Sequence, residues 1–149
     1  MLDCECYIDL SSDKGGGLME RKKCEQLWAK NKYLVLSKSQ KIYLAIRQYL
    51  KSESVELNVL ERLIQDAISL EERPQEVINA YQHIWSYFKR VAEPNERKEF
   101  LFLLERYQQS KLPKEKVLMY LNDLLEKYPN RYLENSTIFK LINDGDEQG

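Results

Sequence analysis

Histidine, glycine and long apolar runs are scarce in this chain. Its 149 residues include one histidine, three cysteines, four prolines and five glycines. One histidine without a placed serine or cysteine nucleophile gives no catalytic triad, and no glycine-rich phosphate loop follows a strand-like segment. No apolar run approaches the roughly 20 residues of a membrane span. We therefore expect no membrane segment, no cofactor and no catalytic residues.

The cysteines indicate a reducing compartment. Cys4, Cys6 and Cys24 are odd in number and lack the spacing of a secreted disulfide framework. Together with His83 they supply four zinc ligands on paper, but unrelated thiols account for them without a metal. The N-terminus has acidic residues and no basic region, unlike a signal peptide. We expect a cytoplasmic protein with no metal site.

The two ends of the chain differ from the rest. Residues 14–19 read KGGGLM, a pattern that a purine-rich ribosome-binding sequence encodes when it is translated in frame. We hypothesise that Met19 is the natural start and that residues 1–18 are a flexible segment, which mass spectrometry of the native N-terminus would test. The polar residues 143–149 are expected to form a disordered tail.

The intervening residues 19–142 have the apolar spacing of helices. Ser37 and Ser39 are candidate N-caps, and all four prolines fall at predicted helix boundaries. No alternation of β-branched residues marks a strand. The pattern predicts one all-α domain of about six helices and no β-sheet, with a short helix or an irregular packed segment at residues 130–142. The predicted helices cover residues 20–36, 40–51, 55–72, 74–92, 94–110 and 113–128.

Charge is distributed unevenly, although the net charge is −1. Residues 20–52 contain nine lysines and arginines against two glutamates, and residues 53–79 contain seven acids against two arginines. This separation permits a basic surface on an otherwise neutral protein. It equally fits two helices of opposite charge that attract each other.

Three blocks of the sequence resemble the YbgA-like family, a bacterial helical domain. The first, WAKNKYLVLSKSQKIY, is similar to a family segment W-x-x-H-K-x-L-x-x-x-H-S-x-x-x-Y. Asn31 and Lys38 stand where the family has histidines. The matching residues are Trp28, Lys32, Leu34, Ser39 and Tyr43.

The second block, VINAYQHIWSYFKR, is close to the family's H-x-N-x-x-x-H-x-x-G-Y-F-K, with Val77 and Ser86 in place of a histidine and a glycine. The third, YQQSKLP with a later YL, is similar to Y-R-x-G-x-x-P and Y-L, with Gln108 for arginine and Ser110 for glycine. The matching residues of both blocks are Asn79, His83, Tyr87, Phe88, Lys89, Tyr107, Pro113, Tyr132 and Leu133.

The resemblance implies a helical domain that occurs alone or fused to a desulfidase of the thiouracil-desulfurase (TudS) type. Such desulfidases remove sulfur from thiolated uracil in nucleotides or tRNA, using an iron–sulfur cluster on their own cysteines. A domain that occurs alone would hold the RNA or dock onto a separately encoded partner. This chain has no desulfidase motif of its own.

A wheel of 100° per residue divides the predicted helix 74–92 into two faces. Asn79 and His83 lie one turn apart, opposite the core. Either this face packs on a second helix, with the two residues hydrogen-bonded as a structural pair, or it binds a ligand. The predicted core stripe consists of Val77, Tyr81, Ile84 and Phe88, with Trp85 and Val91 at its flanks.

The basic segment and this polar face together predict an RNA-binding module without catalytic activity, with tRNA or another structured RNA as its partner. Lysine and arginine neutralise phosphates, while amide, imidazole and phenol groups contact exposed bases. The alternatives are a module that docks a desulfidase-type or other enzyme, and an enzyme with a site around His83. The predicted binding residues are Lys32, Lys38, Ser39, Lys41, Tyr43, Asn79, His83, Tyr87, Lys89 and Arg90.

Overall fold

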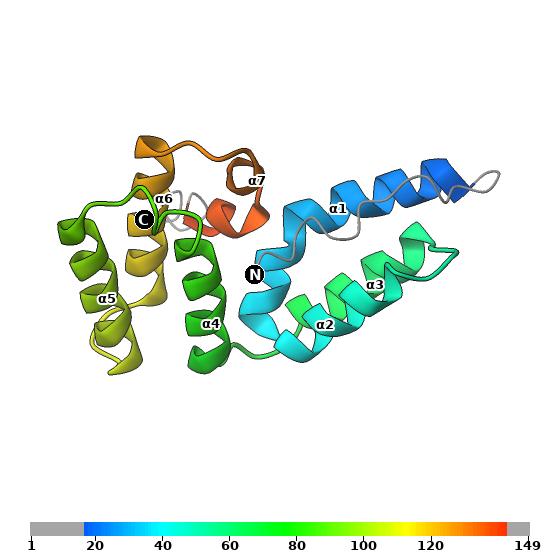
Figure 1. Ribbon diagram of the computed structural model, residues 1–149. Coiled ribbons are helices and arrows are strands. Elements are labelled where there is room, and N and C mark those ends of the chain that lie inside the picture. The colour runs from blue at the N-terminus through cyan, green and yellow to red at the C-terminus, as the bar shows by residue number, and fades with distance from the viewer. Residues whose placement is uncertain (1–16, 143–149) are drawn as a thin grey trace.

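The longest helix, α1 (Gly17–Lys38), connects two groups of helices in the computed structural model, which describes residues 17–142 (Figure 1). No strand occurs in this part of the chain, so the all-α prediction is confirmed. The remaining elements are α2 (Gln40–Tyr49), α3 (Leu57–Ile68), α4 (Pro74–Trp85), α5 (Pro94–Gln108), α6 (Lys114–Lys127), α7 (Arg131–Glu134) and the 3-10 helix η2 (Thr137–Phe139).

On one side of α1 lie α2 and α3, and on the other side lies α4, which packs in turn against α5 and α6 (Figure 1). The segment α7–η2 returns to α1, where η2 contacts both α1 and α6. Because the basic helix α1 packs against the more acidic α3, the two charged segments are neighbours, as the second interpretation of the charge pattern expects.

Local capping signals set most helix boundaries as predicted. Ser39 separates α1 from α2, and its Oγ accepts a hydrogen bond from the Ile42 amide at 3.0 Å. Pro74 and Pro94 are the first residues of their helices, where a missing N–H costs nothing. Pro113 is the N-cap of α6, and Pro129 follows its C-terminal cap.

The C-terminus of α5 has a residue in a left-handed conformation. Ser110 has φ 63°, the one positive φ of a non-glycine residue between residues 17 and 142. Its amide donates to the Tyr107 carbonyl at 3.0 Å, and the Lys111 amide donates to the Arg106 carbonyl at 2.9 Å. These two bonds form a Schellman motif, which favours glycine at this position. The family-like segment has glycine where this chain has Ser110.

Two polar side chains of α1 cap neighbouring helices. Arg21, only 8% exposed, donates to the carbonyls of Leu50 at 2.9 Å and Ser52 at 2.5 Å, at the end of α2. The Glu20 carboxylate accepts from the Leu57 amide at 2.7 Å, at the start of α3. The positive guanidinium lies at the negative C-terminal end of one helix dipole, and the negative carboxylate lies at the positive N-terminal end of another, so both interactions are stabilising. These contacts fix α2 and α3 against α1.

The predicted core stripe of α4 is buried, but the helix itself is shorter than predicted. It ends at Trp85 instead of continuing to Ala92. Beyond it, the amides of Tyr87 and Phe88 donate three residues back, to the carbonyls of Ile84 and Trp85, so these turns are tighter than an α-helix. A 100° wheel therefore does not apply after residue 85.

Helix α3 also differs from its prediction, covering 57–68 instead of 55–72. The segment 130–142 forms α7 and η2, in line with the short helix or irregular packing expected there. No helix of residues 17–142 is long and apolar enough to cross a bilayer. The predictions for Cys4, Cys6, the N-terminal segment up to residue 16 and the tail 143–149 lie outside the described residues.

Candidate functional site

The polar face predicted on the segment 74–92 is partly covered, because α4 packs against α1 and Tyr87 meets a residue of that helix. Tyr87, just past the end of α4, shares a 2.6 Å hydrogen bond between hydroxyl groups with Tyr33 of α1. The two rings meet edge to face, with centroids 6.0 Å apart. This contact joins the first and second family-like blocks. It also supports the interpretation that the polar face packs on a second helix.

Lys32 is buried beside this pair of tyrosines. Only 3% of the residue is exposed, and its ammonium lies 5.5 Å from the centroid of the Tyr33 ring and 5.9 Å from that of Tyr132. Lysine is seldom buried without compensation, and two aromatic rings at this distance attract the charge. Because Tyr132 belongs to the third family-like block, residues from all three blocks meet around Lys32.

The side chain of Asn79 has a buried hydrogen-bond donor without a partner among the described residues. Its Nδ2 is buried, and no described residue accepts a hydrogen bond from it. His83 follows one turn later on α4 and is half-buried. The expected hydrogen bonding of Asn79 and His83 as a structural pair stays a prediction. A buried amide donor without a partner costs about 1–3 kcal/mol, which marks this position as functionally or sterically constrained.

We name the contacting residues Lys32, Tyr33 and Tyr87 the interior cluster; Asn79 and His83 lie on α4, two turns and one turn before Tyr87. The cluster contains groups that can transfer protons, but among residues 17–142 no three His, Cys, Asp or Glu side chains gather to bind a metal. Cys24 does not supply a nucleophile either. Its burial, followed by the charge of Glu20, raises the pKa of the thiol to about 11, so the thiol stays protonated at neutral pH.

Three of the predicted RNA-binding residues are buried, which corrects the open face expected from the sequence. Lys32 is in the interior cluster, Ser39 caps α2, and Tyr43 is 3% exposed with its ring 5.4 Å from that of Trp28. Lys38 donates to the Leu70 carbonyl at 3.1 Å, next to the end of α3.

The other predicted cations lie on separate elements. Lys41 is exposed on α2, whereas Lys89 and Arg90 are exposed in the turns after α4. Two positions where the family has histidine also serve packing in this chain. Val77 is in the core, and the Asn31 amide donates to the Leu27 carbonyl at 3.0 Å and accepts from Thr137 at 2.8 Å.

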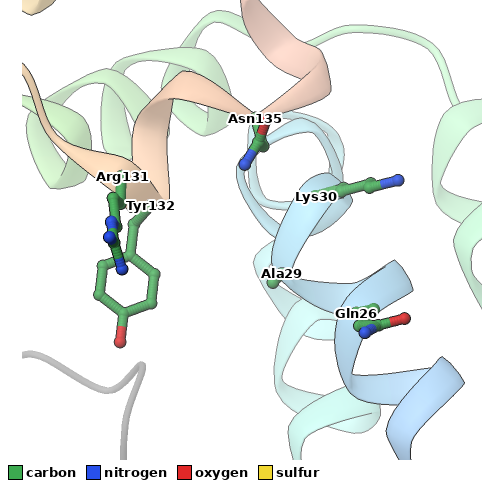
Figure 2. A pocket seen from close by; sticks show the side chains of 6 residues that line it. All are labelled: Gln26, Ala29, Lys30, Arg131, Tyr132 and Asn135. Carbon is green, nitrogen blue, oxygen red and sulfur yellow. The ribbon is translucent and has the colours of Figure 1, made fainter.

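A groove of about 750 Å³ lies between α1 and α7. The sequence did not predict this site. Its residues combine two cations, two amides and an aromatic ring, and its volume is typical of ligand sites. Figure 2 shows Arg131 and Tyr132 extending together from α7 on one flank, while Lys30 and Gln26 extend from α1 on the other. The lining residues are Gln26, Ala29, Lys30, Arg131, Tyr132 and Asn135.

Several contacts fix the two walls of this groove. The Asn130 side chain caps α7 by accepting from the amides of Tyr132 at 2.9 Å and Leu133 at 3.2 Å. Leu133 is fully buried, and Thr137 of η2 donates to the Lys30 carbonyl at 3.2 Å. These contacts tie α7 and η2 to α1, so the groove is formed before any ligand arrives.

Tyr132 connects the groove with the interior cluster. The residue is 47% exposed and lines the groove, yet its ring also receives the ammonium of the buried Lys32. On α1, the spacing of Gln26, Ala29 and Lys30 places them on one helical face, which a wheel of this helix would have shown. Nothing in the sequence places Arg131 and Tyr132 opposite that face.

Comparison with known proteins gives one match. No curated protein and no solved structure matches the chain. Residues 32–142 match the family described as "Protein of unknown function (DUF1722)", and the YbgA-like resemblance agrees with this match. The matched range contains the whole interior cluster and the α7 wall of the groove, and it begins two residues after Lys30. The chain belongs to this family of proteins of unknown function.

Proposed function

We propose that the protein binds structured RNA, with tRNA as the first candidate, and that it does so without catalysing a reaction. The observation that carries this proposal is the groove between α1 and α7, where Lys30 and Arg131 flank the half-exposed ring of Tyr132. Cations, amides and an aromatic platform in one concave site are the groups that contact phosphates and unpaired bases.

The basic side of α1 extends this site. Lys23 and Lys30, two turns apart on the helix, line a smaller hollow of about 210 Å³ together with Glu61 of α3, and this hollow shares Gln26 and Lys30 with the groove. Both lysines are exposed. Because the net charge of the chain is −1, the attraction of RNA depends on this local stripe instead of the whole surface.

The family resemblance supplies the biological setting of the proposal. A domain that accompanies desulfidases acting on thiolated uracil suits a protein that holds thiolated tRNA in the cytoplasm. The interior cluster adjoins the groove, since the ammonium of the buried Lys32 lies 5.9 Å from the centroid of the Tyr132 ring. In this proposal His83 stabilises the α1–α4 junction and does not contact the RNA.

A salt titration of tRNA binding tests the proposal. Each phosphate contact contributes roughly 0.7 to 0.9 to the slope of log K against log salt. The double variant Lys30→Gln, Arg131→Gln should therefore make this negative slope shallower, by about 1.4 to 1.8. The matched control is Lys98→Gln, Arg97→Gln, two exposed cations of α5 away from the groove. Binding that shows no salt dependence, or that both double variants weaken equally, would refute the proposal.

A docking function is the second candidate, and α5 favours it. Leu101 and Phe102 are exposed side by side on this helix, with Arg106 5.5 Å over the Phe102 ring. An exposed aromatic with a neighbouring arginine is typical of protein interfaces. If this helix docks a desulfidase-type enzyme, Phe102→Ser should abolish capture of that enzyme after nuclease treatment, whereas the groove variants should not.

A further inference from the structure

We infer that the groove receives one unpaired nucleotide of an RNA strand, whose base stacks on Tyr132 while Arg131 and Lys30 contact two different phosphates. This inference rests on the proposed RNA-binding function and makes it specific. It distinguishes an unpaired position within a strand from a paired helix and from a free mononucleotide.

The ring of Tyr132 is suited to stacking from the groove. The ammonium of Lys32, a residue that is only 3% exposed, lies 5.9 Å from the centroid of this ring. The same tyrosine is 47% exposed toward solvent and lines the groove. Because the Asn130 side chain holds the backbone amides of Tyr132 and Leu133, the turn that carries the ring is ordered before a base stacks on it, which favours affinity.

The directions of the cations favour a strand over a free nucleotide. In Figure 2, Arg131 extends beside Tyr132, whereas Lys30 extends from α1 away from both. One phosphate group bound by both cations would need them to converge. Two successive phosphates of a chain that crosses α1 can each meet one of them, and they place the intervening base near Tyr132.

The amides provide hydrogen bonds without a fixed preference for one base. Asn135 lies between the two flanks of the groove, and Gln26 lies next to Lys30 on α1 (Figure 2). Each amide offers both a donor and an acceptor, which suits a base edge or a ribose 2′-hydroxyl. A paired base cannot stack on Tyr132 unless it leaves its helix, which requires its pairing and stacking to be broken.

The test compares three probes with the full-length protein: an RNA hairpin with 2-aminopurine in its unpaired loop, a fully paired duplex of equal length, and AMP. We expect the hairpin to bind about tenfold more tightly than the duplex, AMP not to compete at millimolar concentration, and the 2-aminopurine fluorescence to fall on binding. Tyr132→Leu should weaken hairpin binding about tenfold without changing the salt slope, and Tyr132→Phe should retain it.

The outcomes separate this inference from the proposed function. Equal salt-dependent binding of hairpin and duplex, with unchanged 2-aminopurine fluorescence, would overturn the inference and leave RNA binding intact. AMP binding as tight as that of the hairpin would overturn the assignment to a strand. Absence of salt-dependent binding to every RNA would overturn both. The fluorescence measurement uses the unaltered protein, so the test does not depend on the folding of Tyr132→Leu.

Discussion

Ser110→Gly should stabilise the protein, although most substitutions to glycine destabilise. Ser110 has φ 63° at the end of α5, a conformation that costs an L-residue about 1–2 kcal/mol and glycine almost nothing. Glycine also loses more backbone entropy on folding, by roughly 0.5–1 kcal/mol. The difference leaves a net gain of about 0.5–1 kcal/mol. For a chain of 149 residues, this raises Tm by roughly 1–4 °C.

The neighbouring residue provides a matched control. Gln109 has φ −87°, so a glycine there relieves no strain and only adds entropy to the unfolded chain. Gln109→Gly should therefore lower the free energy of unfolding by about 0.5–1 kcal/mol. Urea unfolding of both variants with equal m-values measures the two effects. A Ser110→Gly variant that loses as much stability as Gln109→Gly would refute this account of the helix end.

Two further predictions concern contacts between helices. Arg21→Met should destabilise the protein by about 2–3 kcal/mol in urea unfolding, because two carbonyls at the end of α2 lose a charged donor, whereas Lys22→Met on the exposed side should change stability by less than about 0.5 kcal/mol. An equal effect of both variants would contradict the capping role. Hydrogen bonds from Lys127, followed by that from the Glu93 amide, lower the pKa of Glu96 from 4.5 to about 2. Since the folded pKa lies below the unfolded value, the contribution of Glu96 to stability is present above about pH 4.5 and is lost as the pH falls toward 2. Glu96→Gln should accordingly flatten the acid side of a stability profile measured from pH 2 to 6, and an unchanged profile would contradict this assignment.

The fold was predictable wherever local chemistry determines it. Prolines and Ser39 stop and start helices through their own backbone geometry and hydrogen bonds, so the order of the helices follows from the sequence. The end of α4 was predicted wrongly because the tighter turns after Trp85 retain an apolar spacing that resembles an α-helix. Phe88 stays in the core in either geometry, whereas Val91, predicted at the flank of the core stripe, is 53% exposed.

The site was less predictable because it depends on contacts between distant segments. Lysine is usually exposed, so Lys32 was expected on an open face. In the structure it is buried, with its ammonium near the rings of Tyr33 beside it and of Tyr132, one hundred residues further along the chain. The groove likewise requires α7 to return to α1, which Thr137 accomplishes through its hydrogen bonds to Lys30 and Asn31. Neither arrangement has a periodic signal.

The range that matches the family contains only part of the groove. Residues 32–142 contain the interior cluster and Tyr132, whereas Gln26 and Lys30 precede this range. A contact such as that between Lys32 and Tyr132 uses residues of the matched range alone. In the proposed mode of binding, Tyr132, on which the base would stack, lies within the matched range, and Lys30, one of the two proposed phosphate contacts, lies on the part of α1 before that range. We accordingly expect Lys30→Gln to lower affinity for every RNA alike, and Tyr132→Leu to remove the preference for unpaired positions.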